Sequence, residues 1–196
     1  MKTTRLEAFS DGVIAIIITI MVLELKTPEG TDLAALRPVL PELSTYVLSF
    51  VYLGIYWNNH HHMLHVTESV SGAILWANLH LLFWLSLIPF TTGWLGESHG
   101  APWPTAMYGV VMLLAAIAYT ALQLTIIRHH GSNSPLATAV GHDFKGKLSM
   151  ALYAVAIALA FAAGWISHLI YAAVALIWFV PDRRIEAVIR AASQSS

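Results

Sequence analysis

The most constraining feature of this sequence is a series of long apolar runs that few charged residues interrupt. The runs cover about residues 8–25, 43–64, 70–92, 104–127 and 147–180. A helix of about 20 apolar residues is long enough to cross the hydrocarbon core of a bilayer. Charged residues make up only 11% of the chain, whereas a soluble domain carries about a quarter. We therefore expect an all-α integral membrane protein.

The last apolar run is too long for a single crossing. As one helix it would extend roughly 50 Å, against a hydrocarbon core of about 30 Å. Gly164 and Trp165 lie near its middle and suggest a tight turn, which would divide the run into spans at about 147–164 and 166–181. The sequence thus predicts six transmembrane helices in a single domain, residues 1–190, and a short disordered tail, residues 191–196.

The distribution of Lys and Arg over the loops predicts the orientation of the chain. With six spans, both termini share one side with the loops that follow the second and fourth spans. That side holds eight basic residues, namely Lys2, Arg5, Arg128, Lys145, Lys147, Arg183, Arg184 and Arg190, and the opposite side holds only Lys26 and Arg37. Because basic loop residues favour the cytoplasmic side, we expect both termini in the cytoplasm and the protein in the cell membrane as a multi-pass protein. A five-span chain would place three of those arginines outside.

Several function classes lack the residues that they would need. A net charge of −1 gives no basic surplus for nucleic acid, and the absence of cysteine excludes disulfides and zinc–thiolate sites. The chain has no TVGYG filter sequence, no regular row of arginines in a span and no phosphate-binding loop. The only acid–base pair at membrane depth is Asp11 with His80, which is thin evidence for an enzyme. We expect no enzymatic activity, no cofactor and no metal, and no cleavable signal peptide.

The first apolar run has one face that combines three large apolar side chains with a single hydroxyl. On a helix, Ile16, Thr19, Ile20 and Leu23 follow the spacing i, i+3, i+4 and i+7. Since the other faces of the run are also apolar, periodicity alone does not decide what this face contacts. Packing against other spans or lipid is the ordinary interpretation.

The same run begins with polar residues at the entrance of the bilayer. Asp11 could be a helix cap, or an ionisable group held by a specific partner, because an unpaired charge at this depth is costly. The third run offers Trp76, Asn78 and His80, of which Trp76 and His80 share one face and Asn78 lies well round the helix. We expect a network of Asp11, His80 and Trp76 to fix the start of the first helix.

Four histidines end the second run: His60, His61, His62 and His65. His61 and His65 are one helical turn apart and could share a metal ion or respond to pH. No carboxylate is adjacent, and the nearest is Glu68. Polar residues at the membrane interface are therefore the preferred interpretation.

The motif Arg5-x-x-x-Phe9-Ser10-Asp11 resembles the start of the prokaryotic branch of the transmembrane protein 175 family, which comprises potassium-permeable channels. The likeness extends over essentially the whole chain. It includes Trp76-x-Asn78, the region of Phe83, Pro89-Phe90, and Trp57 with His61-His62. The motif is fairly specific, whereas the other matches are individually weak.

The resemblance implies a homotetramer in the lipid bilayer, with the first helix of each subunit lining a central pore for potassium ions. Aligned from Asp11, it places the constriction at Ile16 and further layers at Thr19 and Leu23, with Ile20 as a neighbour. Arg5, Phe9, Ser10 and Asp11 would belong to a structural network with Trp76, Asn78 and His80.

The expected function is accordingly a potassium-permeable channel whose apolar ring acts as the gate and as a modest selectivity filter. Acidic residues of the outer loop would attract cations weakly; they are Glu24, Glu29, Asp32 and Glu42, against Lys26 and Arg37. The alternative is a secondary or proton-coupled transporter, which would need internal repeats, broken helices or charges at the bilayer midplane. Pro89 and Gly164 are the candidate breaks.

Overall fold

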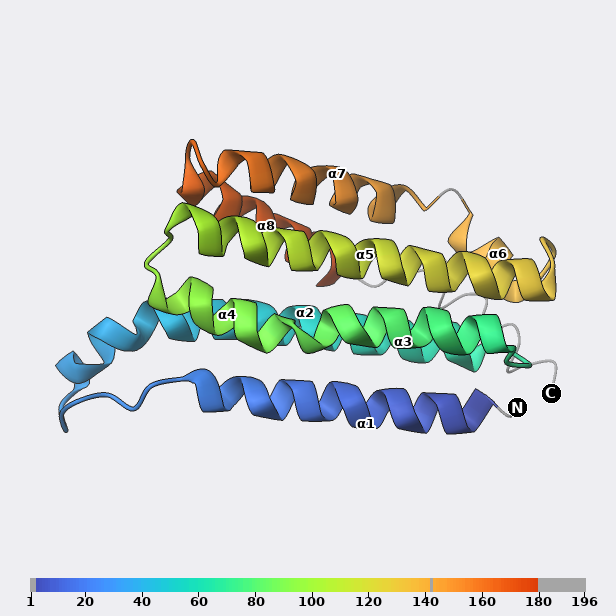
Figure 1. Ribbon diagram of the computed structural model, residues 1–196, viewed down its shortest axis with the longest axis horizontal. Coiled ribbons are helices and arrows are strands. Elements are labelled where there is room, and N and C mark those ends of the chain that lie inside the picture. The colour runs from blue at the N-terminus through green and yellow to red at the C-terminus, as the bar shows by residue number, and fades with distance from the viewer. Residues whose placement is uncertain (1–2, 142, 180–196) are drawn as a thin grey trace.

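The fold is a bundle of helices that lie side by side along the long axis of the molecule (Figure 1). A computed structural model describes residues 3–141 and 143–179, and within these ranges there is no strand. The helices are α1 (Thr3–Met21), η1 (Val22–Glu24), η2 (Leu33–Val39), α2 (Leu40–His65), α3 (Gly72–Ser86), α4 (Ile88–Glu97), α5 (Pro102–His130), α6 (Pro135–Val140), α7 (Phe144–Leu159) and α8 (Gly164–Phe179). In Figure 1, α1 runs along one edge of the bundle and α7 along the opposite edge.

Four segments are long and apolar enough to cross a membrane: Thr3–Glu24, Leu33–His65, Gly72–Glu97 and Pro102–His130. The all-α membrane prediction is confirmed for the described residues. Helices α7 and α8 have 16 residues each, about 24 Å of helix, so the count of six crossings stays a prediction. The predicted tail, the end of the last span, and Lys2, Arg183, Arg184 and Arg190 lie outside the described residues.

The third span is not the continuous helix that its apolar run predicts. Helix α3 ends at Ser86, and α4 begins at Ile88 with a proline in its first turn. Pro89 has no N–H to donate to the preceding turn, and its ring clashes with the carbonyl four residues earlier. The regular α-helical hydrogen bonding is therefore interrupted at Leu87, and α4 continues to Glu97, beyond the predicted end at about residue 92.

The turn in the last apolar run lies slightly before the predicted position. Residues 160–163 form the turn, and Gly164 begins α8. A Cβ atom at Gly164 would lie 3.3 Å from the carbonyl oxygen of Gly100, so glycine lets this helix start close to the α4–α5 turn. The stretch between the apolar runs 104–127 and 147–180 is partly helical, because α5 extends to His130, α6 covers Pro135–Val140 and α7 begins at Phe144.

Helix α5 supplies much of the core. Five of its apolar side chains are 0% exposed: Tyr108, Met112, Ala115, Ala118 and Leu122. At Gly109 a Cβ atom would collide with the hydroxyl of Tyr171 from α8. Small residues on α5 therefore allow neighbouring helices to approach closely, as is common between membrane helices.

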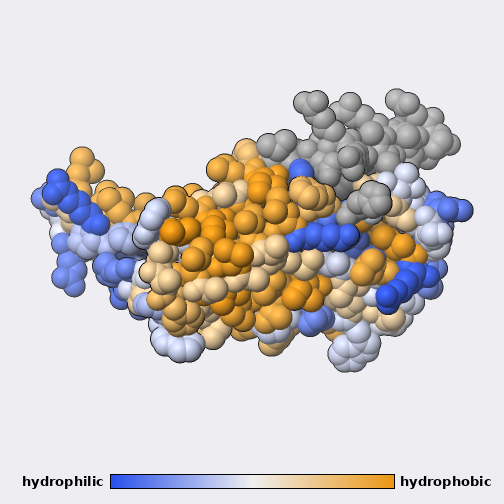
Figure 2. All heavy atoms as spheres, turned by 90° about the horizontal axis from the view of Figure 1, so that it is seen from above, coloured by the Kyte–Doolittle hydropathy of each residue, from blue (hydrophilic) through white to orange (hydrophobic). Residues whose placement is uncertain are grey.

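The outer surface has the distribution of a protein that sits in a bilayer. Figure 2 shows apolar side chains over much of the middle of the molecule and hydrophilic side chains gathered toward its two ends. Large exposed apolar residues include Trp76, Phe90, Trp103, Trp165 and Leu176. An apolar band of this kind would be unfavourable in water and is favourable in lipid.

Candidate functional site: the first helix

Helix α1 has one face buried in the subunit and one face that the subunit leaves uncovered. The buried face consists of Leu6, Ser10, Ile14, Ile17 and Met21, and it packs against α2, α3 and α4. The uncovered face carries Ile16, Thr19 and Ile20 and continues into η1 at Leu23, with Ile16 58% exposed and Leu23 78% exposed. The four predicted pore residues thus lie together, and in a bilayer they must meet either lipid or another chain. That they line a pore stays a prediction.

A hollow of about 480 Å³ lies beside the uncovered face. Val13, Ile16, Ile17, Ile20 and Glu24 line it from the first helix and η1, and Ser86, Pro89 and Phe90 line it from the break between α3 and α4. The break in the third span therefore adjoins the same side of α1 as Ile16 and Ile20.

The single hydroxyl of the uncovered face is already engaged within its own helix. Thr19 Oγ1 donates a hydrogen bond to the carbonyl oxygen of Ile16 at 2.9 Å. Its hydrogen therefore satisfies a backbone acceptor, and its side chain remains exposed.

A buried network of Ser10, Asn78 and His60 holds the start of α1. Ser10 Oγ donates to the Leu6 carbonyl at 2.8 Å, and Asn78 Nδ2 donates to Ser10 Oγ at 2.9 Å. Asn78 Oδ1 and His60 Nε2 are 2.7 Å apart. All three side chains are 0% exposed. Because the amide oxygen can only accept, His60 Nε2 donates, and the neutral imidazole leaves Nδ1 without a partner among the described residues.

His60 is the member of this network that the sequence did not identify. The sequence alone predicts the same interfacial position for all four clustered histidines. Helical periodicity distinguishes His60 from the other three histidines, because His60 shares the buried face of α2 with Ser49, Leu53 and Leu64. His60 is therefore the histidine that points into the subunit.

Asp11 is bound by α2 rather than by α3. Trp57 Nε1 donates to Asp11 Oδ1 at 3.0 Å. One turn away, His61 stacks on Trp57 and its Nδ1 lies 2.8 Å from Glu7 Oε1. Two carboxylates of α1 are thus each held by an aromatic side chain of α2.

The expected network of Asp11 with His80 and Trp76 was wrong. His80 Nε2 instead accepts a hydrogen bond from Trp84 Nε1 at 2.9 Å, and Trp76 is 75% exposed. The buried face of α3 is the one that carries Asn78, so residues on the opposite side point away from α1. Arg5 and Phe9 are also exposed and lie outside the network.

Among residues 3–141 and 143–179, no group of three or more His, Asp or Glu side chains could hold a metal ion. The rings of His61 and His65 stack with their centroids 6.1 Å apart. The pairing of His61 with Glu7 gives this part of the cluster a contact with the first helix.

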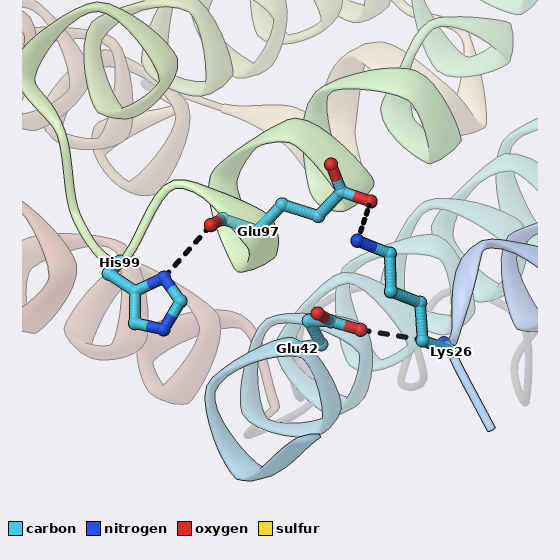
Figure 3. Close-up of polar contacts among 4 residues, drawn as sticks. All are labelled: Lys26, Glu42, Glu97 and His99. Carbon is cyan, nitrogen blue, oxygen red and sulfur yellow. Dashed lines mark hydrogen bonds and ion pairs between the residues drawn. The ribbon is translucent and has the colours of Figure 1, made fainter. Parts of the chain in front are cut away.

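The other end of the first helix is held by charges at the surface. Lys26 Nζ lies 2.9 Å from Glu97 Oε1 at the end of α4, and the Lys26 backbone N–H donates to Glu42 Oε2 of α2 at 3.4 Å (Figure 3). His99 Nδ1 donates to the Glu97 carbonyl at 2.9 Å. The hydrogen bond that Lys26 Nζ donates to the Glu97 carboxylate is the main reason that the pKa of Lys26 is raised above its ordinary value. These contacts tie the α1–α2 connection to α2 and α4.

Comparison with known proteins gives consistent matches. Residues 5–89 match the family described as endosomal/lysosomal potassium channel TMEM175. A potassium channel of Chryseobacterium sp. (strain P1-3) is 55% identical over 186 residues, which cover 95% of this chain and 97% of that protein. The endosomal/lysosomal proton channel TMEM175 of Homo sapiens is 33% identical over 96 residues, covering 42% of this chain and 19% of that protein.

One solved structure has a similar fold. The crystal structure of a lysosomal potassium-selective channel TMEM175 homolog from Chamaesiphon minutus superposes with a TM-score of 0.78 at 28% identity, covering 92% of this chain and 97% of that one. The match to the Chryseobacterium protein, which extends over 95% of this chain, is decisive. The chain belongs to the TMEM175 family.

Proposed function

We propose that this protein is a potassium-permeable channel of the cell membrane, in which four copies place α1 around a common axis. The observation that carries the proposal is the asymmetry of α1: one face is bonded into the subunit, and the opposite apolar face is uncovered. The relative from Chryseobacterium is named a potassium channel, and the similar crystal structure is that of a homolog of the lysosomal potassium-selective channel TMEM175.

In this proposal each subunit crosses the bilayer six times, with α7 and α8 as the last two spans. Each of these helices is about 24 Å long, which is shorter than the hydrocarbon core of about 30 Å. Helix α8 is apolar. An even number of crossings keeps the basic residues of the loops and termini on one side, which the positive-inside rule makes cytoplasmic.

A ring of four Ile16 side chains would form the constriction. Apolar side chains close a narrow passage by excluding water, and a slight separation of the helices would admit a partly dehydrated ion. Potassium gives up its water more readily than sodium, so such a ring favours potassium modestly. Thr19 and Leu23 would add two further layers toward the α1–α2 connection, with Ile20 beside them.

The test is the Ile16→Asn variant, measured as single-channel current in planar bilayers under potassium and sodium gradients. An amide at the constriction keeps the pore wet, so we expect more frequent opening and a potassium-to-sodium permeability ratio that falls toward one. The matched control is Ile117→Asn, since Ile117 is an exposed apolar residue of α5. Unchanged gating and selectivity in Ile16→Asn would refute the assignment of the constriction.

A secondary or proton-coupled transporter is the second candidate, and the helix break at Leu87–Pro89 favours it. Broken helices often surround the binding sites of transporters, and here the break lies beside the hollow at Ile16 and Ile20. A transporter would give slow flux that requires a coupled substrate or proton gradient. Resolved unitary currents under a potassium gradient alone would exclude it.

A further inference from the structure

Among the acidic residues near the α1–α2 connection, Glu24 and Glu29 both have carboxylates that no described residue engages, and of these two only Glu24 lines the hollow beside α1. Glu97 and Glu42 both contact Lys26, and Asp32 accepts a hydrogen bond from the Ala35 N–H at the start of η2. Within the described part of the chain, Glu24 makes no hydrogen bond and no ion pair. Its charge is therefore available to a mobile cation.

The side chain of Glu24 has a defined position. It follows Leu23 at the end of the first helix and lines the same hollow as Ile16 and Ile20. A Cβ atom at Gly93 would lie 3.1 Å from Glu24 Oε2 and 3.5 Å from Glu24 Cβ. The glutamate thus lies against the backbone of α4 at Gly93, where a Cβ atom would require the carboxylate to shift slightly.

Lys26 is the basic residue closest to Glu24 in the sequence, but it does not neutralise the Glu24 carboxylate. Lys26 points to Glu97, and its backbone N–H is turned to Glu42 (Figure 3). The ammonium group is committed to Glu97, which leaves Glu24 as the unpaired charge at the end of the uncovered face.

We propose that Glu24 attracts cations to the mouth of the pore at the end that carries the α1–α2 connection. This inference rests on the proposed channel, because it requires α1 to line the path of the ion. In a tetramer four such carboxylates would surround the mouth, and their fields would raise the local potassium concentration. The effect falls with salt, since the screening length shortens from about 10 Å at 0.1 M to about 3 Å at 1 M.

The chain has no cysteine, so a single introduced cysteine can be modified with a reagent that adds either a negative or a positive charge at that position. In Glu24→Cys we expect potassium current entering from the connection side to fall about two- to threefold at low salt and to be nearly normal at about 1 M. Current in the opposite direction should change less. A methanethiosulfonate reagent bearing a sulfonate, added to that side, should restore the current, and one bearing a trimethylammonium group should reduce it further.

Two variants separate charge at the mouth from a structural effect. Thr31→Cys, at an exposed residue of the same connection, should respond little to either reagent. Glu24→Gln removes the charge but keeps the size of the side chain, so it should give the same one-sided loss, and it serves as the test if Glu24→Cys is not recovered folded.

Several outcomes would overturn the inference. They are an unchanged conductance in Glu24→Cys, a loss that is equal in both directions and at all salt concentrations, or identical responses to the two reagents. A wild-type protein that carries no potassium current would instead overturn the proposed function, so the two failures are distinguishable.

Discussion

At its amino-terminal end α1 is held by Ser10, which is completely buried and bonded to Asn78, whereas its other end leads to Lys26, whose side chain is 64% exposed and paired with Glu97. The first contact is neutral and has no water to replace a lost partner. The second is charged, and water and salt compete with it continuously. The comparison teaches that a hydrogen bond between uncharged groups can anchor this helix more firmly than an ion pair, because burial decides the cost of losing it.

The largest expected effect comes from removing the centre of the buried network. Asn78→Leu leaves Ser10 without its donor and His60 Nε2 without its acceptor, and each unsatisfied buried group costs about 1–3 kcal/mol. We expect the free energy of unfolding to fall by about 2–4 kcal/mol, measured as reversible denaturation in detergent. Asn58→Leu, at an exposed position of α2, is the control and should change stability little. Equal losses of unfolding free energy in the two variants would show that the buried network does not hold α1 more firmly than its exposed end.

A smaller effect is expected at the serine itself. Ser10→Ala removes the acceptor of Asn78 Nδ2 and should cost about 1–2 kcal/mol. Because the two residues share one hydrogen bond, the double variant Ser10→Ala/Asn78→Leu should be less destabilised than the sum of the single variants. Strict additivity in the same denaturation assay would show that the two side chains do not act together.

The smallest effect is expected at the exposed end. Lys26→Gln removes the ion pair with Glu97, and surface pairs contribute little and are screened by salt. We expect the midpoint of thermal unfolding to shift by less than about 2 °C at low ionic strength and not at all in about 1 M salt. A large shift that persists at high salt would mean that the two ends of α1 are held with similar strength.

The sequence predicted the elements better than their contacts. The apolar runs located the helices, and the Arg5-x-x-x-Phe9-Ser10-Asp11 motif led to the family to which the chain belongs. The hydrogen-bond partners of the α1 side chains were harder to predict. Helix α3 is apolar on all sides, so only packing determines which of its faces lies toward α1. Asn78 lies on that face and His80 does not, although both are polar residues at the same depth of the span.

The break in the third span was likewise concealed by its composition. Residues around Leu87 are as apolar as those on either side, so hydropathy alone runs through them as one segment. Pro89 was noted as a candidate break, yet only the structure shows that α3 stops at Ser86 and that the break adjoins the hollow beside α1. A lone proline bends or ends a helix according to its neighbours, which a single sequence does not specify.

The hydrogen bond from Thr19 to the Ile16 carbonyl has a consequence for the sign of the ions that the proposed pore would admit. With its hydrogen directed at the backbone, the hydroxyl presents only oxygen lone pairs outward. Four such oxygens can ligate a cation, but they offer a chloride ion no donor. The helix would thus discriminate by charge at this layer without placing any charged residue in it.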